Sequence, residues 1–484
     1  MENFASKTKL VGLIAGPSLF LIIYFLLGTS SLSLKAVVVL SLGAWMVTWW
    51  VTEAVPIPVT ALLPMVLFPL LSVSTVREAS QPYGDPVIFL FMGGFILALG
   101  LEKYNLHERV ALNLIRLTGT SGNGIILGFM LATAIISMWI SNTATAVMML
   151  PIASSVTSLL AKETGQHDDP GFKKFATGLM LSIAYSASIG GMATIIGTPP
   201  NVVMVGYMKR FYNLDVSFSS WMIVGIPLMI ALLASCYFII TKILYRNNLP
   251  AIEGSEKLIH RKLHELGKMT KEEKLVLVIF SVTCFFWIFR QNINALIGKN
   301  LLDDTTIAMT GGVFMFLMPV NLSKSKFVLE WSDMKNLPWG ILLLFGGGLC
   351  LAEGMEDAGL VQIVGEKISQ QGAIGLPALT FLLTFISMAL TEIMSNVALT
   401  TIFVPVVFGI ADGFNISPIL LAMPVTFAAS CAFMMPVSTP PNAILFASGY
   451  IKIKEMIKAG LLLNIFSLVI IFIISMTLMR WVFA

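Results

Sequence analysis

Long apolar runs separated by short polar connections make up most of the chain. Runs close to the ~20 residues that cross a bilayer as a helix recur from one end to the other. Because lipid cannot hydrogen-bond to open backbone groups, such runs must be helical. The pattern predicts eleven membrane-spanning segments, at 10–27, 34–51, 57–72, 86–101, 174–208, 221–244, 274–289, 305–320, 337–352, 417–450 and 456–483. We therefore expect an all-α polytopic membrane protein, and composition agrees, with 57% hydrophobic and only 12% charged residues.

Two further apolar stretches, 122–160 and 372–410, are each interrupted near the middle by Ser-Asn. The first contains ISNTATAVMMLP, from Ile140 to Pro151, and the second contains MSNVALTTIFVP, from Met394 to Pro405. We interpret each stretch as a re-entrant hairpin that enters and leaves the membrane on one side, with its tip at the Ser-Asn pair.

The distribution of positive charge predicts which side of the membrane each connection faces. With the N-terminus in the cytoplasm, connections assigned to the cytoplasm hold 22 of the 30 Lys and Arg, eight of them between Lys242 and Lys274. This asymmetry is what the positive-inside rule predicts, and it would be lost if either hairpin were a full crossing. The formal net charge of +4 therefore reflects topology in a multi-pass protein of the cytoplasmic membrane, and a nucleic-acid partner is not expected.

Three pairs of matching segments indicate an internal duplication. The Ser-Asn pairs are 254 residues apart, and the same offset relates FMGGFILALGLE from Phe91 to FGGGLCLAEGME from Phe345. GTPPNVV from Gly197 and STPPNAI from Ser438 are 241 residues apart. We divide the chain into an N-terminal segment with the first span (1–33), a first repeat (34–244), a cytoplasmic linker (245–273) and a second repeat (274–484). The basic linker also carries five Glu, which favours a solvated connection over a lipid or partner site.

Five predicted crossings separate the two hairpins. Because five is odd, one hairpin enters from the cytoplasm and the other from outside. This inverted repeat is typical of secondary transporters, in which the binding site lies near the middle of the membrane where the halves meet.

The hairpin tips and the two Pro-Pro segments carry the candidate chemistry. Each tip leaves backbone groups unpaired and adds polar side chains, from Ser141, Asn142 and Thr143 in the first and from Ser395 and Asn396 in the second. The arms that follow begin helices whose N-terminal ends favour an anion. Thr-Pro-Pro-Asn should break spans five and ten and free carbonyl groups for a hard cation. The alternatives are hydrogen bonding between helices and plain proline kinks.

Charged and metal-binding residues are scarce around these segments. No Lys or Arg lies near them in sequence, so a bound dianion needs co-bound cations to offset its charge. Glu392, close to the second tip, is either a proton or cation partner or a carboxylate buried against backbone donors. The four Cys lie singly in apolar runs and the four His lie in polar connections, which excludes a catalytic metal centre or nucleophile and base near the tips. The chain also lacks the GxxxxGK[ST] loop of an ATP-driven pump.

Together these motifs resemble the divalent anion/sodium symporter family of di- and tricarboxylate transporters. The resemblance rests on WWVTEAVPIPVTALLP from Trp49, SNTAT from Ser141, GTPPN from Gly197, SNV from Ser395 and STPPN from Ser438. It implies two sodium sites, the first from Ser137, Ser141, Asn142 and Gly197 and the second from Thr391, Met394, Asn396 and Ser438. It implies substrate contacts from Asn142, Thr143, Thr198, Asn396, Val397, Thr439 and Pro440. It also implies a homodimer in which a transport domain moves like an elevator along a scaffold. Where the family usually has SNT at the second tip, this chain has SNV, so Val397 lacks the hydroxyl that Thr143 offers.

We therefore expect a secondary active transporter of C4 or C5 dicarboxylates such as succinate, malate, fumarate or 2-oxoglutarate, coupled to sodium. A dicarboxylate exchanger that needs no sodium gradient is the alternative, and an anion channel is a more remote one. Besides the carboxylate and sodium, the expected partners are membrane lipid and a second copy of the chain.

Overall fold

The fold class predicted from the sequence is confirmed by a computed structural model that describes residues 2–29, 32–164, 170–247, 253–370 and 374–483. Within these ranges, nine helices are long and apolar enough to cross a membrane, and shorter apolar helices occupy 57–70, 122–137, 304–317, 376–391 and 418–429. The protein is an all-α polytopic membrane protein. Residues 372–373 of the predicted second hairpin and 248–252 of the predicted linker lie outside the described residues.

The elements follow one another closely along the chain. In the first half they are α1 Glu2–Leu27, α2 Leu34–Thr52, α3 Ile57–Thr60, α4 Leu63–Leu70, α5 Val76–Ser80, η1 Gln81–Gly84, α6 Pro86–Lys103, α7 Leu106–Leu117, α8 Gly122–Ser137, α9 Asn142–Thr164, α10 Pro170–Gly191, η2 Ile195–Gly197, α11 Pro199–Tyr212, α12 Phe218–Phe238 and η3 Ile239–Leu244. In the second half they are α13 Glu253–Glu265, α14 Lys271–Ile297, α15 Asp304–Leu317, β1 Pro319–Asn321, η4 Leu322–Lys324, β2 Lys326–Phe327, η5 Trp331–Asn336, α16 Trp339–Asp357, α17 Leu360–Ser369, α18 Leu376–Thr391, α19 Asn396–Gly413, α20 Pro418–Ala429, α21 Pro440–Phe446, α22 Ile453–Met476 and α23 Leu478–Phe483.

Both Ser-Asn pairs interrupt a helix, as predicted. In the first half α8 ends at Ser137 and α9 begins at Asn142. The Ser141 hydroxyl accepts a hydrogen bond from Ala144 N at 3.2 Å and so caps the new helix. In the second half α18 ends at Thr391 and α19 begins at Asn396. Each stretch is therefore a pair of helices joined by a four-residue tip, 138–141 in the first half and 392–395 in the second.

The two Pro-Pro segments also break their spans. α10 ends at Gly191, the short helix η2 follows, and α11 begins at Pro199. α20 ends at Ala429, and α21 begins at Pro440 after a ten-residue segment that contains no helix. Thr198 and Thr439 each precede the new helix in an extended conformation, which is the conformation that a following proline favours.

Several shorter elements were not among the predicted spans. They include α7 and α17, two amphipathic helices that directly precede α8 and α18, as well as α5, α13 and a two-stranded antiparallel sheet of β1 and β2. Charged residues interrupt the apolar runs of α7 and α17, so neither helix has the apolar length of a membrane span. Their apolar residues nevertheless recur with helical spacing, which is typical of an amphipathic helix.

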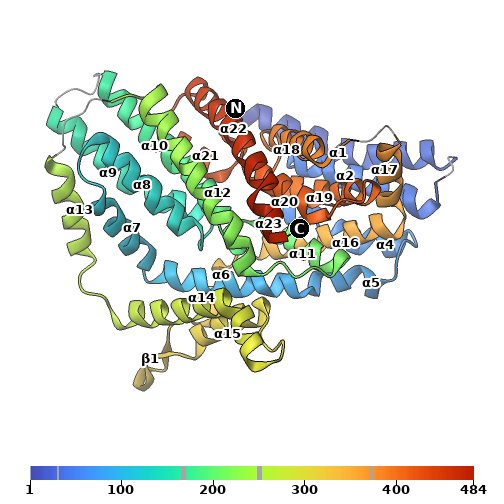
Figure 1. The fold of residues 1–484 in the computed structure, drawn as a ribbon, viewed down its shortest axis with the longest axis horizontal. Helices are drawn as coiled ribbons and strands as arrows, with labels where there is room; N and C mark the ends of the chain where they lie inside the picture. Colours follow the sequence, from blue (N-terminus) through green and yellow to red (C-terminus); the bar gives the residue numbers. More distant parts are fainter. Residues whose placement is uncertain (1, 30–31, 165–169, 248–252, 371–373, 484) are drawn as a thin grey trace.

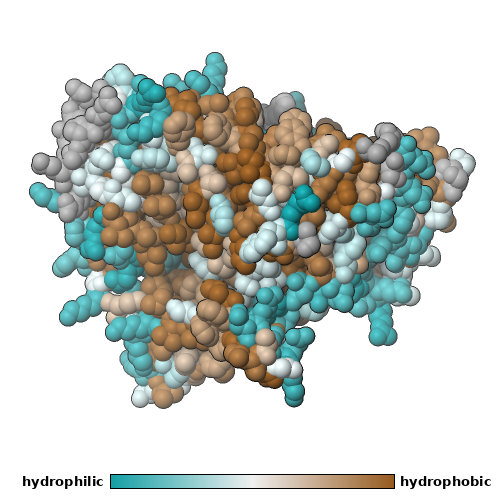
Figure 2. Space-filling view, viewed as in Figure 1, coloured by the Kyte–Doolittle hydropathy of each residue, from teal (hydrophilic) through white to brown (hydrophobic). Residues whose placement is uncertain are grey.

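Long-range ion pairs join connections that the sequence assigns to the same side of the membrane. Lys103 contacts Asp333 at 2.7 Å and Arg109 contacts Glu273 at 2.8 Å, both between connections assigned to the cytoplasm. Arg210 Nε lies 2.6 Å from Glu353 Oε1, between connections assigned to the outer side. Figure 2 shows hydrophobic side chains over α10, α12 and α22, with hydrophilic ones gathered toward the edges of the molecule.

A buried arginine ties α14, the α11–α12 connection and the start of α15 together on the side assigned as outer. Arg290, at the C-terminal part of α14, lies 2.6 Å from Asp215 Oδ2 and 3.4 Å from Asp304 Oδ1. Asp304 in turn accepts a hydrogen bond from the backbone N of Phe218, the first residue of α12. Arg290 and Asp304 are only 4% and 6% exposed and so belong to the packed interior, whereas Asp215 is exposed.

The repeated glycine motif allows close approach between the two halves. A Cβ on Gly93 of α6 would lie 2.5 Å from the backbone of Ala308 in α15, and a Cβ on Gly347 of α16 would lie 2.0 Å from the carbonyl oxygen of Ala61. Gly93 thus packs against α15 and Gly347 against the turn between α3 and α4, in each case a segment of the other half. Figure 1 shows α8, α9 and α10 side by side at one end, with α14 and α15 projecting from one long side.

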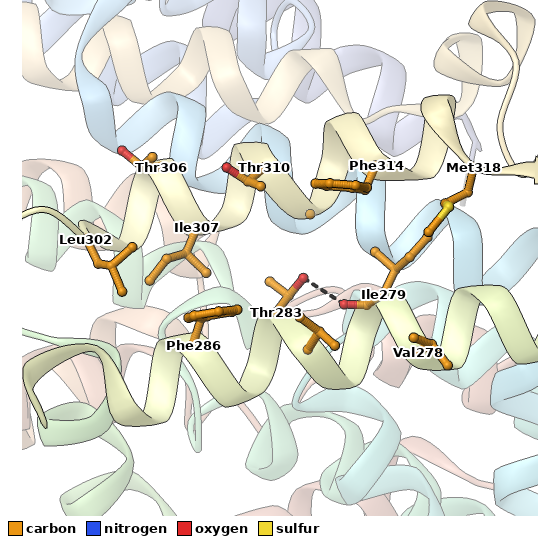
Figure 3. A pocket seen from close by; sticks show the side chains of 12 residues that line it. Val278, Ile279, Thr283, Phe286, Leu302, Thr306, Ile307, Thr310, Phe314 and Met318 are labelled. Atoms are coloured by element: carbon orange, nitrogen blue, oxygen red, sulfur yellow. Dashed lines mark hydrogen bonds between the residues drawn. The ribbon is translucent and has the colours of Figure 1, made fainter. Parts of the chain in front are cut away.

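An apolar cavity of about 390 Å³ lies between α14 and α15 (Figure 3). Its wall consists of side chains such as Ile279, Phe286, Ile307 and Phe314. The Thr283 hydroxyl donates to the Ile279 carbonyl oxygen within α14 and is thereby satisfied. The hydroxyls of Thr306 and Thr310 also line the cavity, which does not contain the predicted site residues.

Candidate binding site at the hairpin tips and broken helices

The first tip is held against α10 by one serine hydroxyl. Ser137 Oγ lies 2.6 Å from Asn142 Oδ1 and 2.7 Å from the carbonyl oxygen of Ala187. A hydroxyl has one proton, so it donates to only one of these two acceptors at a time. A Cβ on Gly191 would lie 2.7 Å from Asn142 Oδ1 and 3.0 Å from the carbonyl oxygen of Gly197. Three oxygen-bearing residues, Ser137, Asn142 and Gly197, therefore converge where α10 ends.

The second tip repeats this arrangement with a threonine. Thr391 Oγ1 lies 2.8 Å from Asn396 Oδ1 and 2.5 Å from the carbonyl oxygen of Ala429 in α20. Thr391 follows Ser137, and Asn396 follows Asn142, by the same 254 residues that relate the sequence motifs. Again one proton serves two acceptor oxygens in a buried place. Both halves thus build the same cluster of a hydroxyl, an amide oxygen and a helix-end carbonyl.

The asparagines of the Pro-Pro segments close the breaks in the two spans. Asn201 Nδ2 donates to the carbonyl oxygens of Gly191 and Thr194 at 3.0 and 2.8 Å. Asn442 Nδ2 donates to those of Ala432 and Met435 at 3.0 and 3.1 Å, with the same spacing along the chain. In both residues the side-chain oxygen Oδ1 is buried and has no hydrogen-bond partner among the described residues. Each broken helix therefore buries one unsatisfied oxygen, which normally costs free energy.

Each half supplies its broken helix to the hairpin of the other half. α21 packs against α9 and α10, and α11 packs against α19 and α20. Tyr207 of α11 donates to the carbonyl oxygen of Thr401 in α19 at 3.1 Å, which fixes one of these contacts. The helices that follow the two tips are thus embedded in elements from both repeats.

The predicted substrate contacts differ in how far they reach the surface. Thr143 and Pro440 are exposed, Asn142, Asn396 and Val397 are half-buried, and Thr198 and Thr439 are only 3% and 5% exposed. Thr439 Oγ1 accepts a long hydrogen bond of 3.4 Å from Asn442 N, so its hydroxyl is partly engaged in capping α21.

The predicted cation ligands are only partly brought together. Ser137, Asn142 and Gly197 converge in the first half, whereas the exposed Ser141 uses its hydroxyl as a helix cap. In the second half Thr391 and Asn396 are hydrogen-bonded, and Ser438, 8% exposed, donates to the Met435 carbonyl oxygen at 2.6 Å. The hydrogen bonds of the described residues do not link Met394 to that group.

Ala187 and Ala429, whose carbonyl oxygens complete the clusters, were not among the predicted site residues. Only the tertiary packing brings those carbonyls to the hydroxyls. The sequence does indicate the two hydroxyls, because Ser137 and Thr391 are separated by the repeat offset of 254 residues. It does not indicate the two carbonyl oxygens, because every residue has a backbone carbonyl.

Basic side chains make no described contact with either cluster. Hydrogen bonds and ion pairs of Lys and Arg within the described residues involve the connections and helix ends, such as Arg109 with Glu273 and Arg290 with Asp215. Among the described residues, the groups at the tips that can meet a negative charge are therefore amides, hydroxyls and helix N-termini.

The structure also shows the surroundings of Glu392, which the sequence allows either as a proton or cation partner or as a carboxylate buried against backbone donors. Its carboxylate accepts hydrogen bonds from the backbone N of Phe433 at 2.9 Å and of Met434 at 3.1 Å, and from Asn464 Nδ2 at 2.7 Å. It is 7% exposed. The carboxylate is therefore buried against backbone and amide donors of the α20–α21 connection and α22.

Comparison with known proteins places the chain among membrane transporters. It matches the family described as "Sodium:sulfate symporter transmembrane region" over residues 7–484. It is 41% identical over 469 residues to the sodium-dependent dicarboxylate transporter SdcS of Staphylococcus saprophyticus, covering 96% of this chain and 90% of that protein. It is 40% identical over 478 residues to the SdcS of Staphylococcus aureus strain USA300, covering 97% of this chain and 91% of the relative.

Two solved structures share the fold at low sequence identity. One is Neisseria gonorrhoeae MtrF, described as illuminating a class of antimetabolite efflux pumps, with a TM-score of 0.57 and 13% identity over 84% of this chain and 83% of that one. The other is the Alcanivorax borkumensis YdaH transporter, with a TM-score of 0.57 and 13% identity over 84% of this chain and 88% of that one. At this identity the likeness concerns the fold alone.

Proposed function

Because the chain belongs to the sodium:sulfate symporter family, we propose that it is a secondary active transporter that carries C4 and C5 dicarboxylates across the cytoplasmic membrane together with sodium. Relatives at 40% and 41% identity over nearly the whole chain are named sodium-dependent dicarboxylate transporters. The wider family name refers to sulfate, which is also a dianion. The shared chemistry is a small guest with two negative charges.

The observation that carries this proposal is the paired hydroxyl cluster. In each half one hydroxyl, from Ser137 or Thr391, faces two acceptor oxygens with a single proton. A hard cation takes oxygen ligands, so sodium at such a cluster satisfies all of these oxygens at once. The repetition in both halves supports two sodium sites. Sodium here is cargo that moves with the substrate.

The substrate fits beside these clusters. α9 and α19 begin at Asn142 and Asn396, so their N-terminal backbone N–H groups and positive dipole ends favour a carboxylate. α11 begins with Pro199 and Pro200, which have no N–H, so it offers only its dipole end. Amide groups of Asn142 and Asn396 and the hydroxyl of Thr143 supply further donors. Two sodium ions nearby offset the charge of a dianion in a region where no basic side chain of the described residues makes a contact.

Coupling between sodium and substrate follows, because each offsets the charge of the other inside the membrane. A dianion without cations and a pair of cations without the dianion each leave net charge inside the membrane, whereas the full complement is neutral. The neutral, loaded state therefore moves between the two sides at the lowest cost. We propose that the two hairpins, with the broken helices packed against them, move as one body in an elevator-type motion, and that the protein is a homodimer.

Reconstituted uptake tests the proposal. In proteoliposomes, an inward sodium gradient should drive concentrative succinate uptake that saturates with substrate. If internal dicarboxylate drives uptake while a sodium gradient does not, the protein is an exchanger. Flux that does not saturate and has no fixed sodium stoichiometry would indicate a channel.

The proposed orientation has a separate test. With the N-terminus inside, Lys268→Cys lies in the cytoplasmic linker and Lys299→Cys lies outside, between α14 and α15. An impermeant maleimide added to intact cells should label only the second variant. Labelling of Lys268→Cys alone would reverse the orientation.

A further inference from the structure

The two hairpin tips are alike in sequence but differ at the residues next to the hydroxyl clusters. Glu392 follows Thr391, whereas the residue that follows Ser137 is Met138. Met138 contributes only its backbone, and its carbonyl oxygen accepts the Thr194 hydroxyl at 2.5 Å. The first tip is thus joined to its broken helix by a neutral hydrogen bond, and the second by a carboxylate.

The carboxylate of Glu392 replaces a hydrogen bond that the second half lacks. In the first half Thr194 Oγ1 also accepts from Gly197 N at 3.0 Å and so organises η2. The position 241 residues later is Met435, which has no hydroxyl. The backbone N–H groups of Phe433 and Met434 instead bind Glu392, which also binds Asn464 of α22. One buried side chain thereby joins the second tip, the α20–α21 connection and α22.

The first tip has a different support, which the second tip lacks. Trp139 stacks on Phe218 with ring centroids 6.0 Å apart and packs edge-on against Phe280 of α14 at 5.1 Å. Phe218 in turn stacks on Trp287 at 4.6 Å. The residue at the same position of the second tip is Ile393, which is 69% exposed. The second tip therefore has no comparable aromatic contact at this position.

We propose that Glu392 is the positioning residue of the second tip, and that by holding the α20–α21 connection against Thr391 and Asn396 it keeps the second sodium site in shape. The role of sodium in this inference rests on the proposed function, whereas the anchoring role does not. Glu392 does not touch the cation. It acts through the connection that carries Ser438 and Thr439.

Three substitutions separate anchoring from direct attraction of a cation. Glu392→Met introduces the residue type that the first tip has at the equivalent position, Met138, and removes both the acceptor oxygens and the charge. Glu392→Gln removes the charge and keeps one oxygen, which in the place of Oε1 still accepts from Phe433 N, Met434 N and Asn464 Nδ2. It loses only the second bond from Met434 N, which Oε2 accepts at 3.1 Å. Asn464→Ala removes one donor and leaves the carboxylate in place. Trp139→Ile is the matched control at the first tip.

A native cysteine reports directly on the connection. Cys431 is fully buried, lies two residues before Phe433 and donates to the Phe427 carbonyl oxygen. Alkylation by N-ethylmaleimide, mapped by mass spectrometry on purified protein without sodium or substrate, measures how often this segment opens. Cys236 and Cys350 are buried in other helices and serve as internal controls.

We expect Glu392→Met to raise the alkylation rate of Cys431 about tenfold, since it removes charge-assisted hydrogen bonds, while Cys236 and Cys350 stay protected. Glu392→Gln should stay near the wild-type rate, Asn464→Ala should lie between them, and Trp139→Ile should leave Cys431 unchanged. The sodium concentration for half-maximal uptake should rise in the same order, whereas the KM for succinate at saturating sodium should change less.

Equal alkylation of Cys431 in the wild type and in Glu392→Met would overturn the proposal. So would a Glu392→Gln variant that keeps Cys431 protected yet needs as much sodium as Glu392→Met, because the charge would then act on the cation directly. If Cys431, Cys236 and Cys350 all become reactive in Glu392→Met, that variant has lost its fold, and the milder Asn464→Ala variant serves as the test. Asn464→Ala must then raise the alkylation rate of Cys431 alone; if it does not, the proposal is wrong. Failure of sodium-driven uptake would refute the proposed function and leave the alkylation result to be judged by itself.

Discussion

Replacement of Thr391 by valine tests the hydroxyl cluster with almost no change of shape. Valine keeps the branched side chain but removes the oxygen that lies 2.8 Å from Asn396 Oδ1 and 2.5 Å from the Ala429 carbonyl. If sodium binds at this cluster, the substitution removes one ligand oxygen. It also removes the proton that bridges tip and helix in the sodium-free protein.

The size of the effect follows from the hydrogen bonds that are lost. A polar contact to a charged group contributes about 1.5 to 3 kcal/mol, and every 1.4 kcal/mol is a factor of ten. The sodium concentration for half-maximal uptake should therefore rise by roughly tenfold to a hundredfold. Ser137→Ala should have a similar effect, because its hydroxyl has the same two kinds of partner at 2.6 and 2.7 Å.

A neighbouring threonine provides the control. Thr426 in α20 is also fully buried, but its hydroxyl donates to the Ala422 carbonyl of its own helix. Thr426→Val should leave the sodium dependence within about twofold of wild type, since only a local bond of a helix is lost.

Sodium-dependent uptake of labelled succinate in proteoliposomes measures these differences, with thermal unfolding in detergent to verify that each variant is folded. The reasoning is refuted if Thr391→Val and Ser137→Ala are folded and show the same sodium dependence as Thr426→Val. A loss of maximal rate with unchanged sodium dependence would also contradict it, because the hydroxyls would then serve the motion rather than the cation.

Other substitutions test the remaining parts of the account. Asn142→Ala and Asn396→Ala should each abolish uptake in a folded protein, as size-exclusion chromatography and uptake can show, and near-normal uptake in either would remove the site assignment. Val397→Thr adds the hydroxyl that the second tip lacks. It should lower the KM for hydroxylated dicarboxylates relative to that for succinate by up to about tenfold, which corresponds to one hydrogen bond. An unchanged ratio of the two KM values in competition assays would place Val397 away from the substrate. Arg290→Gln should destabilise the protein by about 3 to 5 kcal/mol because it leaves Asp304 buried without its partner. Lys35→Gln is the control: Lys35 lies 3.4 Å from Asp357 in a solvent-exposed ion pair, and its loss should cost less than about 1 kcal/mol. Equal unfolding midpoints for the two variants would contradict this.

Much of the fold is readable from the sequence because the membrane imposes a simple rule. Apolar length predicts the helices, and proline and the Ser-Asn pairs predict where they break, as at Pro199 and Asn396. α7 and α17 escape this rule, since their charged residues lower the mean hydropathy although their apolar faces are regular.

Side-chain partners from distant segments were harder to predict. The tip residues Asn142 and Asn396 stand out because they repeat. The role of Glu392 depends on donors 41 to 72 positions away in the chain, so either of its two interpretations fitted the sequence. The burial of Arg290 has the same origin, because its carboxylate partners come from the α11–α12 connection and the start of α15.

Binding of succinate to the purified protein by calorimetry, in sodium and in potassium at equal ionic strength, tests the central claim most directly. If two oxygen clusters filled by sodium offset the charge of the guest, binding should be measurable in sodium and absent in potassium. Equal affinity in both salts would show that the protein neutralises the dianion without sodium, and would contradict the account.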